Sequence, residues 1–175
     1  MREAAEAFLA LEASGWKGRE RSAMASDRFR AAFAREAINR LAELDMCRVH
    51  TLRLDGRPIA ALVVFVEGGI AYTWKIAYDE ALGRFSPGML LMLEVTKSLL
   101  EDPNIEMSDS CAAPNHPLVG RIWSEARPIG TMIVGLSPDA ERATRQAAQQ
   151  FHLYSETKNV LRLVRNRVRN LTRRR

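Results

Sequence analysis

The chain has 175 residues, of which 47% are hydrophobic, 26 are Lys or Arg and 21 are Asp or Glu. This length suits one globular domain, and the hydrophobic share is too high for intrinsic disorder. No apolar run approaches the ~18 residues of a membrane span, and the charged amino terminus lacks the apolar stretch of a signal peptide. We therefore expect a globular, cytoplasmic protein.

The net charge of +5 is concentrated at the carboxyl end. Residues 158–175 contain eight of the basic residues and no acidic one, so the rest of the chain has 18 basic against 21 acidic residues, a net charge of −3. This distribution argues against a body that binds nucleic acid. It predicts a domain over residues 1–157 and a basic tail over residues 158–175.

Cysteine and histidine are scarce in the sequence. The two cysteines have no CxxC spacing, and there are three histidines. These residues form neither a disulfide framework nor a pattern of metal ligands, so we expect no bound metal.

The predicted elements begin with an amphipathic helix over residues 3–13, followed by a loop over residues 16–19. A second helix is expected to begin at the N-cap Ser26 or Asp27. Its apolar stripe, which should face the core, consists of Phe29, Phe33, Ala37, Leu41 and Leu44.

Three strands are predicted next, over residues 47–54, 57–66 and 70–78. The pairs Asp55-Gly56 and Gly68-Gly69 between them are turn signals, so the three strands should form an antiparallel meander. The middle strand is almost entirely aliphatic, which is typical of a strand buried on both faces.

The second half of the chain alternates between helix and strand. We expect a helix over residues 87–101, a strand over 105–108, a helix over 116–125 and a strand over 128–136, with a helical pattern from Ser137 onward. The predicted fold class is α/β (α+β): a mixed, mostly antiparallel, twisted sheet flanked by helices, with a basic C-terminal helix.

The loop at residues 83–89 is a candidate anion site. Ser86 is a natural N-cap and Pro87 suits the first helical position, so the N–H groups of residues 88–90 should be free at the positive end of the helix dipole. Arg84 adds a charge suited to a phosphate. An ordinary Ser-Pro helix start is an equally weighted alternative.

Three segments carry a resemblance to a known family. They are FLALEASGWKG at residues 8–18, LDGRPIAA at 54–61 and AYDEALGRFSPG at 77–88. In this order they resemble the GNAT superfamily of acyltransferases, in a bacterial branch associated with cellulose and other exopolysaccharide biosynthesis. That branch is related to the aminoacyltransferases that build peptidoglycan bridges.

The resemblance implies acyl transfer with acetyl-CoA, or another acyl-CoA, as co-substrate. In that fold the loop before the central helix holds the donor's pyrophosphate, and the residues at this position are Arg84, Phe85, Ser86, Pro87, Gly88 and Met89. Two neighbouring parallel strands, here residues 71–78 and 105–108, splay apart to admit the pantetheine arm. An acceptor amine loses a proton and attacks the thioester, while a backbone N–H holds the developing oxyanion.

Two residues are candidates for catalysis. Asp109 matches a position where the family usually has an acidic residue, which implies a general base; an aspartate that caps a loop is the slightly favoured alternative. Lys75 is expected on the small-residue side of its strand, where it could bind a phosphate or polarise a carbonyl. A surface lysine with its head in water is the ordinary explanation for such a residue.

Four residues are candidates for substrate binding. Trp16 follows a helix end, where a tryptophan typically covers the core, but the adjacent Lys17 would suit an anionic or sugar-containing acceptor. Tyr78 and Asp79 could shape the donor loop, and Asp79 is equally explained as a turn residue.

The sequence departs from the family in two respects. Family members usually have an additional N-terminal half, and after Asp109 they have a Gly-rich turn and a Tyr-Lys pair that residues 110–117 lack. Two functions therefore stay open. One is acylation of an amine or hydroxyl on a small-molecule or envelope-sugar acceptor, and the other is a non-catalytic GNAT-like module that binds a membrane-associated partner.

The basic tail has the pattern of an amphipathic helix. Its apolar stripe is Leu161, Val164, Val168 and Leu171, and Arg162, Arg165 and Arg169 lie off that stripe. Such a helix can lie on an anionic lipid surface at the inner membrane face or pack on the domain, and residues 173–175 suit a surface-binding patch. A homodimer is a further option that the sequence leaves open.

Overall fold

The computed structural model describes residues 1–112, 116 and 119–172, without the side chains of residues 138, 162 and 165–172. The chain divides into two compact units, Met1–Ser124 and Glu125–Arg175, which we describe separately. The expected boundary between residues 157 and 158 lies within helix α5 (Glu141–Thr172) and stays a prediction.

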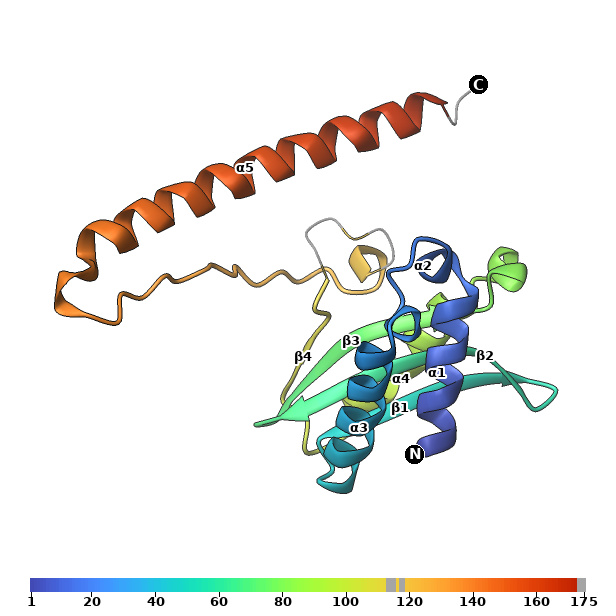
Figure 1. The fold of residues 1–175 in the computed structure, drawn as a ribbon. Helices are drawn as coiled ribbons and strands as arrows, with labels where there is room; N and C mark the ends of the chain where they lie inside the picture. Colours follow the sequence, from blue (N-terminus) through green and yellow to red (C-terminus); the bar gives the residue numbers. More distant parts are fainter. Residues whose placement is uncertain (113–115, 117–118, 173–175) are drawn as a thin grey trace. The chain divides into compact units, whose positions relative to one another are not determined.

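A four-stranded mixed sheet forms the centre of the first unit (Figure 1). Its strands are β1 (Cys47–Leu54), β2 (Arg57–Glu67), β3 (Ile70–Tyr78) and β4 (Met107–Asp109). They lie side by side in this order; β1, β2 and β3 are antiparallel, and β4 is parallel to β3. The predicted meander and the mixed, mostly antiparallel sheet are confirmed.

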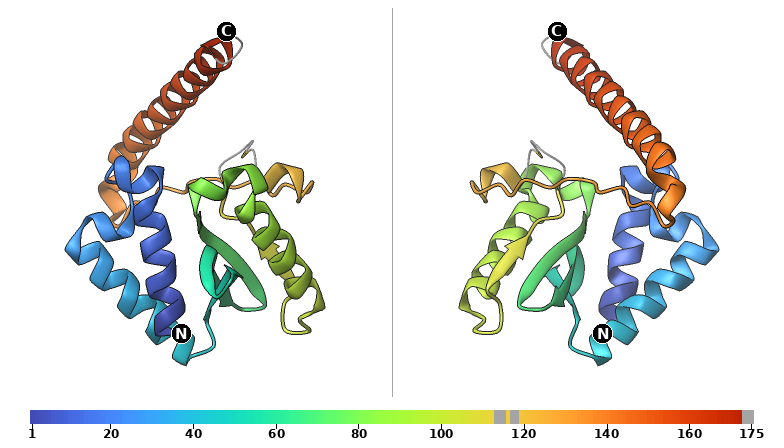
Figure 2. Two further views of the ribbon diagram at one scale, coloured as in Figure 1. Left: turned by 90° about the vertical axis from the view of Figure 1, so that its right-hand side faces the viewer. Right: turned by 90° about the vertical axis from the view of Figure 1, so that its left-hand side faces the viewer.

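Helices cover both faces of this sheet (Figure 2). They are α1 (Arg2–Ser14) and α3 (Arg28–Glu43) on one face and α4 (Pro87–Glu101) on the other. Phe8 and Val63 belong to the hydrophobic core on the α1 and α3 side, while Leu62 and Val95 belong to the core on the α4 side. Because β2 sends successive side chains into both cores, its predicted burial on both faces is confirmed.

Helix α3 buries a face that is largely different from the predicted one, although the predicted Leu41 does pack, partly buried, against the core. Phe29 and Phe33 are each 69% exposed, and the buried residues are Ala31, Ala34 and Ile38. Two apolar stripes compete on this helix. The alanine stripe allows the helix to approach its neighbours closely, so packing distance outweighs side-chain size.

The segment between α1 and α3 is more regular than expected. The predicted loop at residues 16–19 is a one-turn helix, α2 (Trp16–Arg19). A Cβ atom at Gly18 would lie 1.7 Å from the carbonyl oxygen of Ala13, so only glycine allows this close approach. Asp27 caps α3, as one of the two predicted N-caps, by accepting hydrogen bonds from two N–H groups of the first turn.

The predicted helix over residues 116–125 is wrong. The residues described there contain one short 3-10 turn, Val119–Arg121, and Leu118 lies outside them. Gly120 weakens a helix at its centre. Side-chain packing holds the segment instead, since Trp123 packs near α4 and its Nε1 donates to Thr96 Oγ1 at 3.0 Å.

The second unit begins with an extended segment and ends in a long helix. Residues 128–136 form no strand, contrary to prediction, and Ile129, Met132 and Leu136 are more than 80% exposed. A strand needs a neighbour for its backbone groups, and none of the four described strands pairs with this segment. The predicted helix is present as η4 (Pro138–Ala140) and α5.

The predicted apolar stripe of the tail is only partly described. Leu161 and Val164 are 64% and 56% exposed. Residues 173–175 and the side chains of Arg162, Arg165, Val168, Arg169 and Leu171 lie outside the described part of the structure. No helix in that part is long and apolar enough to cross a membrane.

Candidate active site

Strands β3 and β4 are paired only where they begin. The register pairs Ile70 with Met107, Ala71 with Ser108 and Tyr72 with Asp109. After this point β4 ends, whereas β3 continues to Tyr78 as an edge on which no further described strand lies. The two predicted parallel strands thus leave an open edge along the second half of β3.

A β-bulge at Trp74 interrupts β3. Trp74 has no partner residue in β2, because the register shifts at this point. A bulge changes the face that the following side chains reach. Ala71 accordingly belongs to the core under α4, whereas Ala77 and Lys75 lie on the α1 side.

Thr73 lies immediately before the bulge. It is 4% exposed, and its Oγ1 has no hydrogen-bond partner among the described residues. A buried hydroxyl without a partner costs free energy, and a bound ligand is one way to satisfy it. Together with the open edge of β3, this residue is a candidate contact for a ligand.

The predicted donor loop is a 3-10 helix, η2 (Glu80–Phe85), that leads into α4. Arg84 and Phe85 are exposed, with the guanidinium 4.5 Å from the ring centroid. Gly88 lies against Tyr78, since a Cβ atom at Gly88 would be 3.0 Å from the ring carbon Cδ1. The start of α4 therefore approaches the end of β3 as closely as glycine allows.

The first turn of α4 differs from the prediction in two details. Ser86 is the N-cap residue, but its side chain makes no capping hydrogen bond and its backbone is left-handed, with φ of 52°. The N–H groups of Met89 and Leu90 donate to the Ser86 carbonyl oxygen at 2.9 and 3.1 Å. The expectation that these two groups are free is wrong, because the turn closes on itself.

The two candidate aspartates make local turn contacts. Asp109 Oδ1 accepts the N–H of Cys111 at 2.7 Å, which is the loop-capping contact that the sequence offered as the alternative. Asp79 Oδ1 accepts the N–H of Ala81 at 3.0 Å, and its Oδ2 accepts from Arg57 at 2.9 Å. Further roles of Asp109 in catalysis and of Asp79 in binding stay predictions.

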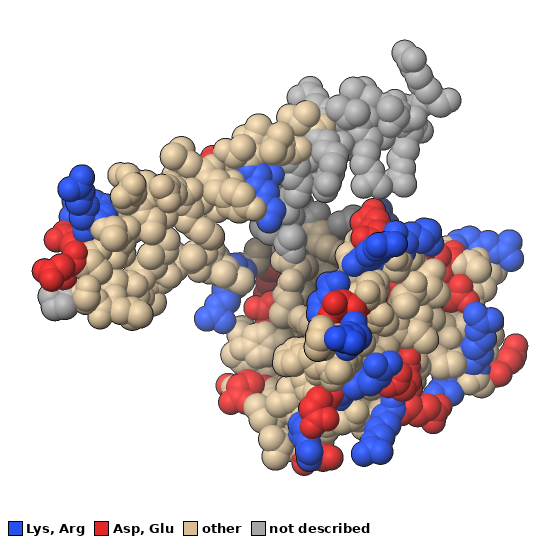
Figure 3. Space-filling model, in the orientation of Figure 1, with Lys and Arg blue, Asp and Glu red and all other residues tan. Residues whose placement is uncertain are grey.

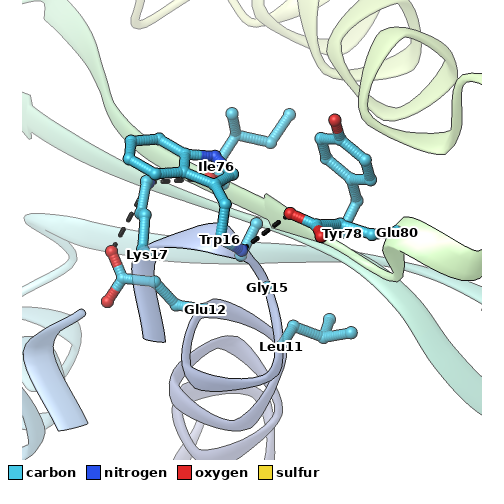
Figure 4. Close-up of a pocket in the computed structure, with 9 residues that line it drawn as sticks. Leu11, Glu12, Gly15, Trp16, Lys17, Ile76, Tyr78 and Glu80 are labelled. Atoms are coloured by element: carbon cyan, nitrogen blue, oxygen red, sulfur yellow. Dashed lines mark hydrogen bonds and ion pairs between the residues drawn. The ribbon is translucent and has the colours of Figure 1, made fainter. Parts of the chain in front are cut away.

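A small pocket opens on the α1 side, between the end of α1, α2 and β3 (Figure 4). Trp16, Lys17 and Glu12 line it, and Lys75 reaches the same glutamate from β3. Tyr78 also lines the pocket, and its ring, which points away from Trp16 in Figure 4, lies against Gly88 at the start of α4. The structure thus brings Trp16, Lys17 and Tyr78 to one pocket, with Lys75 on the same glutamate, and Tyr78 also contacts the start of α4.

Glu12 is the centre of this cluster, and its side chain is 0% exposed. Oε1 accepts from Lys75 Nζ at 2.7 Å and from Lys17 Nζ at 3.4 Å, and Oε2 accepts from the N–H of Met24 at 2.8 Å. Burial raises the pKa of Glu12, but these hydrogen bonds and the two lysine charges hold it below its ordinary value. The carboxylate is therefore ionised at neutral pH.

Three residues of the site were not predicted. Glu12 continues the apolar stripe of the first helix, and an acidic residue on a buried stripe requires partners, so the sequence contained a signal for it. Glu80 accepts from the N–H of Trp16 at 2.7 Å and from Arg19 at 2.6 Å, and these partners are distant in the sequence. For Thr73, the sequence contains no signal of a role in the site beyond the alternation of the strand.

The sequence and the fold both match known acetyltransferases. The family model described as Acetyltransferase (GNAT) domain matches residues 1–115. No curated protein matches the chain. A possible acetyltransferase from Clostridium difficile 630 is similar in structure, with a TM-score of 0.56, 8% identity and coverage of 77% of this chain and 95% of that one.

A second solved structure is also similar. It is the ribosomal-protein-alanine N-acetyltransferase from Brucella melitensis biovar Abortus 2308, with a TM-score of 0.50, 16% identity and coverage of 78% of this chain and 94% of that one. At such low identity, both structures demonstrate a shared fold and nothing about substrate.

Proposed function

The chain belongs to the GNAT acetyltransferase family, and on that premise we propose that it transfers an acyl group, in the first place acetyl, from coenzyme A to an amine or hydroxyl of a small-molecule or envelope-sugar acceptor. The observation that carries the proposal is the open edge of β3 beyond Tyr72, with the bulge at Trp74 and the buried hydroxyl of Thr73 beside it.

Coenzyme A would be held on the α4 side of β3. Arg84 supplies a charge for the pyrophosphate, Gly88 lets the helix start lie against Tyr78, and the buried hydroxyl of Thr73 is a candidate partner for the pantetheine arm. When bound, the co-substrate supplies an acyl group activated as a thioester. Trp74 has no register partner in β2, and its N–H is our candidate donor to the acyl carbonyl oxygen.

The acceptor would approach from the α1 side, where Trp16 and Lys17 form its wall. Asp109 is our candidate for the group that takes the acceptor proton, because it ends β4 opposite Tyr72, close to the bulge. Its hydrogen bond with the N–H of Cys111 uses one lone pair of Oδ1, and a carboxylate has further lone pairs that can accept a proton. Lys75 is assigned to positioning of the acceptor rather than to proton transfer.

Calorimetric titration with coenzyme A tests the donor site. Gly88→Ala puts a methyl group into the contact with Tyr78 and should weaken binding at least about tenfold. Gly83→Ala is the matched control in the same loop, since nothing lies within 4 Å of its added Cβ atom. Equal affinity of the two variants, or no binding by the natural sequence at millimolar coenzyme A, would refute the donor site.

We also propose that the tail binds an anionic membrane surface, either as an anchor for the enzyme or, in the alternative function, as the contact of a non-catalytic module. The exposed Leu161 and Val164 and the basic sequence of residues 158–175 support this. Flotation with anionic vesicles should be lost in a chain that ends at Asn159. Equal flotation of both chains would refute membrane binding by the tail.

A homodimer is our proposal for the exposed segment 128–136. Ile129, Met132 and Leu136 expose apolar surface that a second copy would cover. Light scattering of the full chain should give twice the monomer mass of 19.7 kDa, and the Met132→Lys variant should have the mass of a monomer. A monomeric natural chain would refute the dimer.

A further inference from the structure

A surplus of positive charge lies beneath Trp16. The ammonium groups of Lys17 and Lys75 share the single carboxylate of Glu12. Each lysine side chain is only 24% exposed, and the glutamate side chain is 0% exposed. Because one carboxylate neutralises one ammonium, a formal charge of +1 is left in a largely desolvated place.

The surplus falls mainly on Lys17. Lys75 makes the short bond to Glu12, at 2.7 Å, whereas Lys17 Nζ lies 3.4 Å from the same oxygen and 3.3 Å from the carbonyl oxygen of Ile76. Burial lowers the pKa of Lys17; Glu12 opposes this shift and the charge of Lys75 adds to it. Lys17 therefore has the longer contacts and the greater need for an anionic partner.

Neighbouring charges do not compensate this surplus. Glu80 lies at the rim of the pocket, but Arg19 pairs with it at 2.6 Å and the N–H of Trp16 donates to it. On the face of the first unit seen in Figure 3, acidic and basic side chains are intermixed. Arg35, for example, pairs with Glu6 on the surface of this unit. The surplus charge is thus a property of the cluster.

The pocket above the cluster is small. It has a volume of about 30 Å³, with the half-exposed indole of Trp16 on one side and the β3 backbone from Ile76 on the other. This is room for about one or two water-sized groups. A terminal group can enter, while the rest of a ligand lies against the indole.

We propose that this pocket binds an oxyanion of the acceptor, a carboxylate or a phosphate, against the ammonium group of Lys17, and that Lys75 adds its charge from its position on the shared Glu12. The inference rests on the proposed function, because it assigns the pocket to the acceptor and narrows that acceptor to an anionic molecule. The oxyanion neutralises the surplus charge and gives Lys17 a close partner. Glu12 is a positioning residue that holds both ammonium groups.

Inorganic phosphate and acetate are the probes, and each is titrated into the full chain at constant ionic strength. Coenzyme A is present in excess, so that phosphate does not occupy the donor loop. The indole N–H resonance of Trp16, identified with Trp16→Phe, reports on the pocket. We expect a saturable shift of this resonance with at least one anion. Tighter binding of phosphate indicates a phosphate-bearing acceptor, and tighter binding of acetate indicates a carboxylate-bearing acceptor.

Charge variants localise the binding. Lys17→Met and Lys75→Met should each weaken it at least about tenfold, whereas Lys17→Arg, which keeps the charge, should stay within about threefold. Lys97→Met is the matched control, because Lys97 is 70% exposed on α4. Unchanged affinity in both methionine variants with native circular dichroism, or no saturable shift with either anion, overturns the proposal.

Failure of the pocket and failure of the proposed function are distinguishable. If coenzyme A binds but neither anion shifts the Trp16 resonance, the oxyanion pocket is refuted and the transferase proposal stands. If the anions bind through Lys17 in a chain that does not bind coenzyme A, the donor site is refuted and the oxyanion pocket stands.

Discussion

Replacement of Glu12 by glutamine tests the charge balance of the cluster. Glu12→Gln keeps the size of the side chain and an oxygen that can accept the N–H of Met24. It removes the carboxylate that contacts both Lys17 and Lys75. Two ammonium groups, each about three-quarters buried, are then left without their counter-charge.

The expected loss of stability follows from the burial of these groups. Removal of one partner from a buried ion pair costs about 3–5 kcal/mol, whereas exposed pairs contribute about 0–1 kcal/mol. The lysines retain 24% exposure, so water and counter-ions reduce the cost. We expect Glu12→Gln to lower the free energy of unfolding by about 2–3 kcal/mol.

Urea denaturation measures this free energy. Glu6→Gln is the control, since Glu6 pairs with Arg35 on the surface and its loss should have a much smaller effect. Adding Lys17→Met to Glu12→Gln should restore part of the lost stability, because it removes the unpaired charge. Two results would refute a buried surplus charge. One is a loss below about 1 kcal/mol in Glu12→Gln. The other is a double variant whose loss of stability equals the sum of the losses of the two single variants.

Three further predictions concern the body of the first unit. Burial and the charge of Arg48 lower the pKa of His50 from its ordinary 6.5. Below about pH 6.5 the unfolded chain therefore binds a proton at His50 more readily than the folded chain does, and the free energy of unfolding should fall as the pH drops. This fall should be less steep in His50→Gln. Gly18→Ala should lower the free energy of unfolding by about 2 kcal/mol or more, seen as a clearly lower melting temperature, whereas Gly83→Ala should leave the melting temperature unchanged. Asp27→Ala removes the cap of α3 and should cost about 1 kcal/mol in urea denaturation; no change would mean that the cap is dispensable.

The meander and helix α4 could be predicted because their signals are local. Asp55-Gly56 and Gly68-Gly69 are turn pairs, and they mark where the strands end. Pro87 and the apolar spacing after it mark α4 from its first residue to Glu101. Such signals need no knowledge of what lies across the sheet.

The buried face of α3 depends on its neighbours. Phe29 and Phe33 have the larger side chains, and a sequence rule based on hydrophobicity places them inside. The structure prefers the alanine stripe, because α3 must lie close to α1 and β1. The prediction of a strand over residues 128–136 was wrong for a similar reason. These residues favour a strand, but a strand forms only beside a partner strand, and none of the described strands pairs with them.

The position of Lys75 depends on a single extra residue in β3. Strict alternation places Lys75 on the same face as Ala71, and this was the sequence prediction. The bulge at Trp74 has no counterpart in local sequence pattern, yet it transfers Lys75 to the face of α1, where Glu12 binds it. Without the bulge, the two lysines would lie on opposite faces of the sheet and no surplus charge would arise. The same irregularity that interrupts β3 at Trp74 therefore also brings Lys75 to Glu12, which explains why this cluster could not be derived from periodicity alone.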